Sequence, residues 1–217
     1  MPKDRAITTK KTNAEIRSEN EVKILDAAER MFSEYGYGGA SMQQIADVAE
    51  LPKSNILYYF KSKKNLYDLI LESMLMSWLD AADEFENRAT PEEAITAYVR
   101  SKMKFARERP YGSTVWAKEI MSGAPLLDTS LTEKFNRWTL ERVGVLEQWM
   151  AKGLINISDP HAFLYLIWST TQHYADFKTQ LMMLHNNKEF TDAEFEAKTV
   201  AVTQMILRSA GLPSTPR

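Results

Sequence analysis

The stretch Ser41–Phe60, SMQQIADVAELPKSNILYYF, decides the fold of the N-terminal part of the chain. Its apolar spacing predicts two short helices, near 42–49 and 53–59, joined by a tight turn. The residues expected to face inward are Ile45, Ala46 and Ala49 on the first helix and Ile56, Leu57 and Phe60 on the second. Because the alanines are small, the two helices can cross closely, as a helix-turn-helix requires.

The outward face of the second predicted helix carries hydrogen-bond donors and aromatic hydroxyls. These side chains are Lys53, Ser54, Asn55, Tyr58 and Tyr59, followed by Lys61. Such groups suit base edges and phosphates. Lys63 opens the next helix, where backbone amides and the helix dipole favour an anion. The same pattern also fits two surface helices of a bundle with half-buried tyrosines and solvated lysines.

The charge distribution favours phosphate binding at the N-terminal end. Residues 1–65 hold eleven Lys and Arg against nine Asp and Glu, whereas the remainder holds sixteen against twenty. Four of the basic residues, Lys3, Arg5, Lys10 and Lys11, lie on the first segment. A local excess of positive charge on a small unit attracts the phosphate backbone.

The rest of the chain predicts an all-α protein. Helical apolar spacing recurs, and no alternating strand pattern is found. We expect about nine helices, near 21–35, 42–49, 53–59, 63–86, 91–108, 112–122, 131–152, 160–184 and 192–210. The predicted organisation is a disordered basic arm over 1–18, a three-helix helix-turn-helix domain over 19–63, and a helical ligand-binding and dimerisation domain over 64–212.

Composition excludes several kinds of site. The 217 residues contain no cysteine, so disulfides and thiolate metal sites are impossible. The three histidines, His161, His173 and His185, lack the spacing of a helical metal pair. The chain starts with polar residues and has no apolar run approaching the roughly 18–20 residues of a membrane span. We therefore expect a cytoplasmic protein with no membrane contact, no cofactor and no metal.

The predicted helix that starts at residue 160 is apolar on more than one face. Its apolar residues are Phe163, Leu164, Leu166, Ile167, Trp168, Tyr174, Ala175 and Phe177. Such a helix must be covered on more than one face. It is either central within its own domain or packed against a second subunit, and we favour the second, which predicts a homodimer.

Three motifs in the N-terminal part resemble a known signature. Phe32-x-x-x-Gly36, Ser41-x-x-x-Ile45-Ala46 and Leu57-Tyr-Tyr-Phe-x-Ser-Lys63 are similar to the signature of the TetR family of one-component transcriptional regulators. The resemblance implies a DNA-binding regulator, not an enzyme, that binds a palindromic operator as a dimer. It implies phosphate contacts from Ser41, Gln43, Tyr58, Lys61 and Lys63, and base-facing positions at Lys53, Ser54, Asn55 and Tyr59.

Two positions depart from the family pattern. Glu50 stands where a glycine is usual in the turn, at a cost of about 1 kcal/mol if it adopts a left-handed conformation. Pro52 replaces the usual serine or threonine, and we expect it to be the first residue of the second helix of the motif.

The C-terminal part resembles the pyrimidine-utilisation regulators of enteric bacteria within this family. The similar segments are SGAPLL at 122–127 and WSTTQHYADF at 168–177, together with Trp78. The resemblance implies a repressor of pyrimidine catabolism that uracil or thymine releases from DNA. It implies a ligand site containing Trp168, Gln172 and Trp78, with Trp116 and Met121 as further walls.

The chemistry of the glutamine supports this interpretation. A buried amide without partners costs roughly 1–3 kcal/mol, and its donor and acceptor match the edge of a pyrimidine ring. Trp78 and Trp168 could stack on both faces of such a ring. His173 is included as a ligand candidate, although its place on the helix also suits a subunit interface.

Other interpretations remain open. Gln172, His173, Tyr174 and Asp176 could form a buried polar network without a ligand. A regulator of the same fold could sense a large apolar drug or fatty acid, which predicts a wholly apolar pocket. A helical enzyme acting on pyrimidines could use His173 and Asp176 as a pair, but no nucleophile or phosphate-binding loop supports it.

Overall fold

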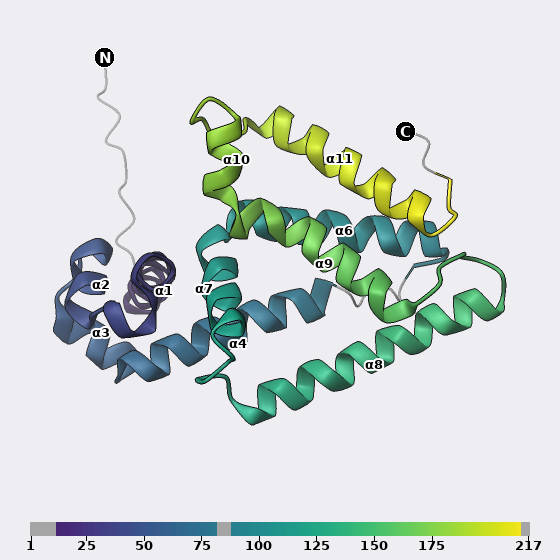
Figure 1. Ribbon diagram of the computed structural model, residues 1–217. Coiled ribbons are helices and arrows are strands. Elements are labelled where there is room, and N and C mark those ends of the chain that lie inside the picture. Colours follow the sequence, from purple (N-terminus) through teal and green to yellow (C-terminus); the bar gives the residue numbers. More distant parts are fainter. Residues whose placement is uncertain (1–11, 82–87, 214–217) are drawn as a thin grey trace, which may run out of the picture. The chain divides into compact units, whose positions relative to one another are not determined.

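The computed structural model describes residues 12–81 and 88–213, which form ten α-helices and no strand (Figure 1). The predicted all-α class is therefore confirmed over this part of the chain. The chain divides into two compact units, Met1–Tyr67 and Asp68–Arg217. Their boundary lies within helix α4, Lys63–Ala81, a few residues beyond the predicted boundary at 63/64. Residues 82–86 of the predicted helix lie outside the described residues.

The first unit begins earlier than the sequence predicted. Helix α1 spans Asn13–Gly39 and starts with a capping box, in which the Thr12 hydroxyl accepts from the backbone amide of Glu15 and the Glu15 carboxylate accepts in return. The prediction of a disordered arm over 1–18 is therefore wrong for residues 13–18. The arm residues 1–11 lie outside the described residues.

Gly36 interrupts α1 close to the end that the sequence predicted. Its φ of 69° and ψ of 174° are non-helical and lie where side chains are disfavoured. The preceding turns bury one apolar face of the helix, made by Ile24, Ala27, Ala28, Met31 and Phe32. This face forms the core on which the next two helices pack.

Helices α2, Met42–Ala49, and α3, Lys53–Phe60, form the predicted helix-turn-helix. Glu50 adopts the left-handed conformation that the turn requires, with φ 55° and ψ 38°. Pro52 precedes α3 with an extended ψ of 139°, so Lys53, and not Pro52, is the first helical residue. Ile56 and Phe60 are buried as predicted, whereas Leu57 is 42% exposed and does not anchor the helix.

The second unit contains the rest of α4 and six further helices. These are α6, Pro91–Glu108; α7, Pro110–Met121; α8, Thr129–Ala151; α9, Pro160–Asp176; α10, Lys178–Leu184; and α11, Asp192–Ser209. Helix α9 is central, because it packs against α6, α7, α8, α10 and α11 (Figure 1). None of the helices within 12–81 and 88–213 has the length and apolar character that a membrane crossing demands.

The predicted single helix over 160–184 is wrong, because the chain bends between α9 and α10. Phe177, at φ −112° and ψ 25°, leaves the helical conformation. No proline or glycine marks this position. Asp176, the last residue of α9, accepts a hydrogen bond from Ser113 Oγ of α7 at 2.6 Å. A tertiary contact therefore accompanies the break, which local sequence does not signal.

The left-handed turn residue gives a direct test of the helix-turn-helix. Glu50→Gly should raise the free energy of unfolding of the first unit by up to about 1 kcal/mol, because glycine relieves the strain of the positive φ. Lys23→Gly, at an exposed position inside α1, should lower it by about 1 kcal/mol. Urea denaturation measures both changes. Destabilisation by both substitutions would contradict the left-handed assignment.

Candidate DNA-binding and ligand-binding sites

The exposed face of the helix-turn-helix collects most of the residues predicted to contact DNA. Lys53, Ser54, Tyr58 and Lys61 are exposed, and Tyr58 is 74% exposed. Asn55 is half-buried. No side chain caps the N-terminus of α3, so its first backbone amides stay available to an anion. The face offers donors and no exposed acid within α3.

Ser41 and Gln43 are both held by local hydrogen bonds. The Ser41 hydroxyl accepts from the amide of Gln44 at 3.2 Å, and Gln43 Nε2 donates to Asp47 Oδ1 at 2.8 Å. The Ser41 hydroxyl proton has no acceptor among the described residues, so it remains free to donate to a phosphate. The capping box thereby orients the hydroxyl that the resemblance assigned to DNA.

Tyr59, which is predicted to face a base, is held against α1. Its ring is half-buried and lies 5.9 Å from the Arg17 guanidinium carbon, and its hydroxyl accepts from Asn20 Nδ2 at 3.4 Å. Both partners belong to α1. Tyr59 therefore joins α3 to α1, whereas its neighbour Tyr58 points into solvent.

Lys63 uses two of its three N–H donors in hydrogen bonds within the first unit. Its Nζ donates to the carbonyl oxygens of Tyr37 at 2.7 Å and Ala40 at 3.0 Å, and lies 4.5 Å from the centre of the Tyr37 ring. These carbonyls belong to the end of α1 and the residue after it. The cation therefore stabilises the C-terminus of α1. A phosphate could reach only the remaining donor without displacing these bonds.

The second unit contains a cavity of about 260 Å³ to which five helices contribute. Each of α4, α6, α7, α8 and α9 supplies two lining residues. They are Trp78, Leu79, Tyr98, Lys102, Trp116, Ile120, Phe135, Trp138, Trp168 and Gln172. An apolar cavity of about 150 Å³ holds a benzene ring. The space is therefore sufficient for one substituted six-membered ring.

Four of the six predicted ligand residues lie together in this cavity, and two do not. Trp78, Trp116, Trp168 and Gln172 are among the lining residues. Met121 is 75% exposed at the end of α7. His173 stacks on Phe177, with ring centres 4.8 Å apart. One step along the helix carries the His173 ring off the face that bears Gln172.

The tryptophans do not form the simple sandwich that the sequence suggested. Trp78 meets Trp116 edge-to-face at 5.5 Å, and the Lys102 ammonium lies 4.0 Å from the centre of the Trp78 ring. A cation, and not an open space, therefore covers one face of Trp78. Trp168 is held by a 2.9 Å hydrogen bond from its Nε1 to the Tyr98 hydroxyl.

Lys102 is the main residue that sequence reasoning missed. Its side chain is only 3% exposed. Burial lowers the pKa of Lys102 to about 7, and the nearby Asp176 opposes this shift. Burial in turn raises the pKa of Asp176, against the hydrogen bond from Ser113. A lysine within an otherwise apolar i, i+3, i+4 pattern was the signal available.

Two further polar groups of the cavity lack partners. The buried Trp138 Nε1 has no hydrogen-bond acceptor, and the half-buried Gln172 amide makes no hydrogen bond to any described residue. Buried polar groups are normally satisfied. The interpretation of Gln172 as part of a closed polar network is therefore not supported. Among the described residues, no cluster of acidic and histidine side chains is arranged to hold a metal.

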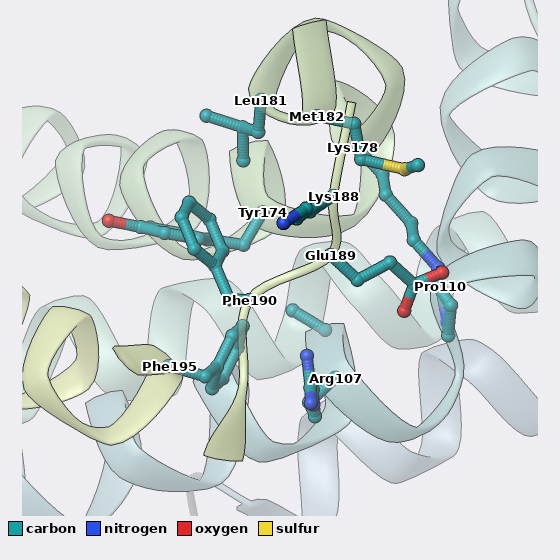
Figure 2. Close-up of a pocket in the computed structure, with 11 residues that line it drawn as sticks. Arg107, Pro110, Tyr174, Lys178, Leu181, Met182, Lys188, Glu189, Phe190 and Phe195 are labelled. Carbon is teal, nitrogen blue, oxygen red and sulfur yellow. The ribbon is translucent and has the colours of Figure 1, made fainter. Parts of the chain in front are cut away.

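A second hollow near the start of α11 is unsuited to a ring (Figure 2). Its volume is about 60 Å³. Figure 2 shows Arg107 close to Phe195 and Lys178 reaching towards Glu189. Lys178 pairs with Glu189 at 2.7 Å, and Arg107 pairs with Asp192 at 2.9 Å. The first pair ties α10 to the segment before α11, and the second ties α6 to the first residue of α11.

The structural role of Lys63 can be tested by comparison with Lys53, an exposed lysine of α3. Lys63→Ala should lower the free energy of unfolding by about 1–3 kcal/mol, because two charged hydrogen bonds to α1 are lost. Lys53→Ala, at an exposed position, should leave the free energy of unfolding unchanged. It should reduce the slope of log K for DNA binding against log salt concentration by about one, because one phosphate contact is lost. Chemical denaturation and salt titration measure these effects. Unchanged stability of Lys63→Ala would show that the observed bonds do not matter.

Comparisons with known proteins agree with the geometry of both units. Residues 24–70 match the family model described as bacterial regulatory proteins, tetR family, and residues 71–213 match that of the C-terminal region of YcdC-like proteins. The chain is 35% identical to the HTH-type transcriptional regulator RutR of Escherichia coli K12 over 184 residues, 85% of this chain and 86% of that protein.

Two further similarities extend this result. The chain is 31% identical over 150 residues to the HTH-type transcriptional repressor NicS of Pseudomonas putida, 66% of this chain and 70% of that protein. A solved TetR family transcription regulator from Marinobacter aquaeolei VT8 shares the fold, with a TM-score of 0.64 and 17% identity over 88% of this chain and 96% of that chain. The chain therefore belongs to the TetR family of bacterial transcriptional regulators.

Proposed function

We propose that the protein is a cytoplasmic, homodimeric repressor that a small pyrimidine such as uracil or thymine releases from a palindromic operator, and that it controls pyrimidine catabolism. The observation that carries this proposal is the cavity in which Gln172 lies among four tryptophans. The similarity to RutR extends over the segments that contribute these residues. The similarity to NicS, a transcriptional repressor, supports the direction of control.

The exposed face of α3 supports operator binding. Lys53, Ser54 and Tyr58 can reach base edges or phosphates, and the uncapped start of α3 can receive a phosphate. Two copies of this helix must lie about 34–36 Å apart to enter successive major grooves. A dimer supplies the second copy, which is why the operator should be palindromic.

The cavity favours a small polar ring over the alternatives. Its aromatic walls suit a planar ligand, and the Gln172 amide offers a donor and an acceptor to a lactam or imide edge. Lys102, Gln172 and Trp138 would be left without partners by a wholly apolar drug or fatty acid. His173, the proposed partner of Asp176 in an enzyme, instead stacks on Phe177.

Helix α4 gives the ligand a route to the DNA-binding unit. It contains Lys63, which holds the end of α1, and Trp78, which lines the cavity. A ligand that prefers one orientation of α4 would bias the separation of the two recognition helices in a dimer. A bias of about 1–3 kcal/mol changes DNA affinity five- to 150-fold.

The outer face of α9 supports dimerisation. Leu166 and Phe177 are 41% and 52% exposed, and His173 lies between them at helical spacing. Met205 of α11 is also 55% exposed. Exposed apolar side chains gathered on helices that are otherwise well packed indicate an interface. A second copy of the chain would cover them and would place His173 in the interface.

Ligand binding can be tested at Gln172. Purified protein should bind uracil or thymine, and Gln172→Ala should weaken binding about five- to 150-fold, because the ring loses its hydrogen bonds to the amide. Gln180→Ala, on the exposed side of α10, is the matched control and should bind like the wild type. Calorimetric titration measures all three. Equal affinity of Gln172→Ala, or no binding of either pyrimidine, would contradict the site.

Dimerisation can be tested on α9. Leu166→Glu should weaken self-association at least about tenfold, because it places an unpaired charge in the proposed interface. Val22→Glu, at a 55% exposed apolar position of α1, should leave self-association unchanged. Sedimentation equilibrium gives both dissociation constants. A Leu166→Glu variant that remains as dimeric as the wild type would place the interface elsewhere.

A further inference from the structure

We propose that the ring is held in the cavity as an anion and that Lys102 is the residue that selects for its negative charge. This inference rests on the proposed function, and it adds the charge state of the ligand and the side chain that recognises it. The charge could reside on the ring itself, as in a deprotonated imide, or on an appended carboxylate. In both cases the ligand is a planar heterocycle whose negative charge lies against the Lys102 ammonium.

The first observation is that Lys102 lacks a hydrogen-bonding partner. It is 3% exposed and forms no hydrogen bond or ion pair with any described residue. Its ammonium lies 4.0 Å from the centre of the Trp78 ring, which gives a cation–π contact but no acceptor. An ammonium that is removed from bulk water without an acceptor is destabilised. Because Lys102 lines the cavity, its ammonium is placed to bind an acceptor on a ligand.

The acid nearest to Lys102 does not neutralise it. Asp176, at the end of α9, acts on Lys102 electrostatically but is not within ion-pair distance. Asp176 Oδ1 is already engaged by Ser113 Oγ at 2.6 Å. It also does not line the cavity. Asp176 therefore biases Lys102 towards its charged form without occupying its donors.

The second observation is the excess of donors over acceptors. Lys102 offers three N–H groups when it is protonated, Gln172 offers two, and Trp138 Nε1 offers one. The only acceptor among these three side chains is the Gln172 carbonyl. The hydroxyl of Tyr98, which also lines the cavity, already accepts from Trp168 Nε1. A complementary ligand is therefore rich in acceptors, and the positive charge at Lys102 makes an anion the best of them.

The titration of Lys102 fits this assignment. Burial lowers its pKa to about 7, so the ammonium is about half formed in the empty cavity at neutral pH. An anion would favour the ammonium and raise that pKa, so binding above pH 7 should take up a proton. Asp176 of α9 and Tyr98 of α6 are the other titratable groups near Lys102, and Arg142 of α8 acts on Tyr98.

Three ring compounds separate the possibilities. Uracil is neutral at pH 6.5, barbiturate carries its negative charge on the ring, and orotate carries it on a carboxylate. Binding to the full-length protein can be followed by quenching of tryptophan fluorescence, since four of the five tryptophans line the cavity. At least one of the two anions should bind ten times more tightly than uracil. The tighter of the two identifies where the ligand carries its charge.

Two variants assign the preference to Lys102. In Lys102→Met the preference for the anion over uracil should fall at least tenfold, while Lys102→Arg should keep most of it. Lys104→Met, at an exposed position on the same helix, is the matched control and should behave like the wild type. From pH 6 to pH 8 the anion affinity of the wild type should fall about tenfold as Lys102 loses its proton, and Lys102→Met should show no such fall.

The outcomes distinguish the two proposals. If uracil binds and neither anion binds more tightly to the wild type, the anion proposal is wrong and the pyrimidine proposal stands. The same holds if Lys102→Met folds and keeps the anion preference. If none of the three rings binds and none alters DNA binding, both proposals fail. Because the wild type alone decides the charge preference, a variant that does not fold leaves the test intact.

Discussion

The burial of the Lys102 ammonium constrains the second unit more than any other single feature. Five helices converge on the cavity that it lines, and aromatic side chains form much of its wall. The ammonium rests on Trp78, while the carboxylate of Asp176 is engaged by Ser113. The donors of Lys102, Gln172 and Trp138 are the basis for proposing a small ring that brings acceptors.

The first unit uses its cations in a different way. Lys63 holds the carbonyl groups of Tyr37 and Ala40, and Arg17 and Asn20 of α1 contact Tyr59. These contacts support the exposed face of α3, where Lys53, Ser54 and Tyr58 remain free of such bonds. Of the residues that the family resemblance assigns to DNA, Lys63 and Tyr59 therefore stabilise the helix-turn-helix. Lys53, Ser54 and Tyr58 form its exposed surface. Helix α4 contains residues of both units, and for this reason we propose it as the element that couples ligand to DNA.

Much of the fold could be predicted from local patterns. The capping box at Ser41, the buried faces of α2 and the need for a left-handed residue at Glu50 are all properties of short segments. The break at Phe177 and the full burial of Lys102 depend on how helices pack against one another, so neither was predicted. Likewise, Trp78, Trp168 and Gln172 were correctly grouped, whereas Met121 and His173 were not, because neighbours in sequence lie on different helix faces.

The central claim is that ligand in the cavity and DNA on α3 influence one another. The most direct measurement is the dissociation constant for a DNA sequence that the protein itself selects from a random pool, with and without a saturating pyrimidine at fixed salt. We predict that the ligand weakens DNA binding by about five- to 150-fold, and that DNA weakens ligand binding by the same factor. Identical DNA affinity in the presence and absence of a bound pyrimidine would contradict it.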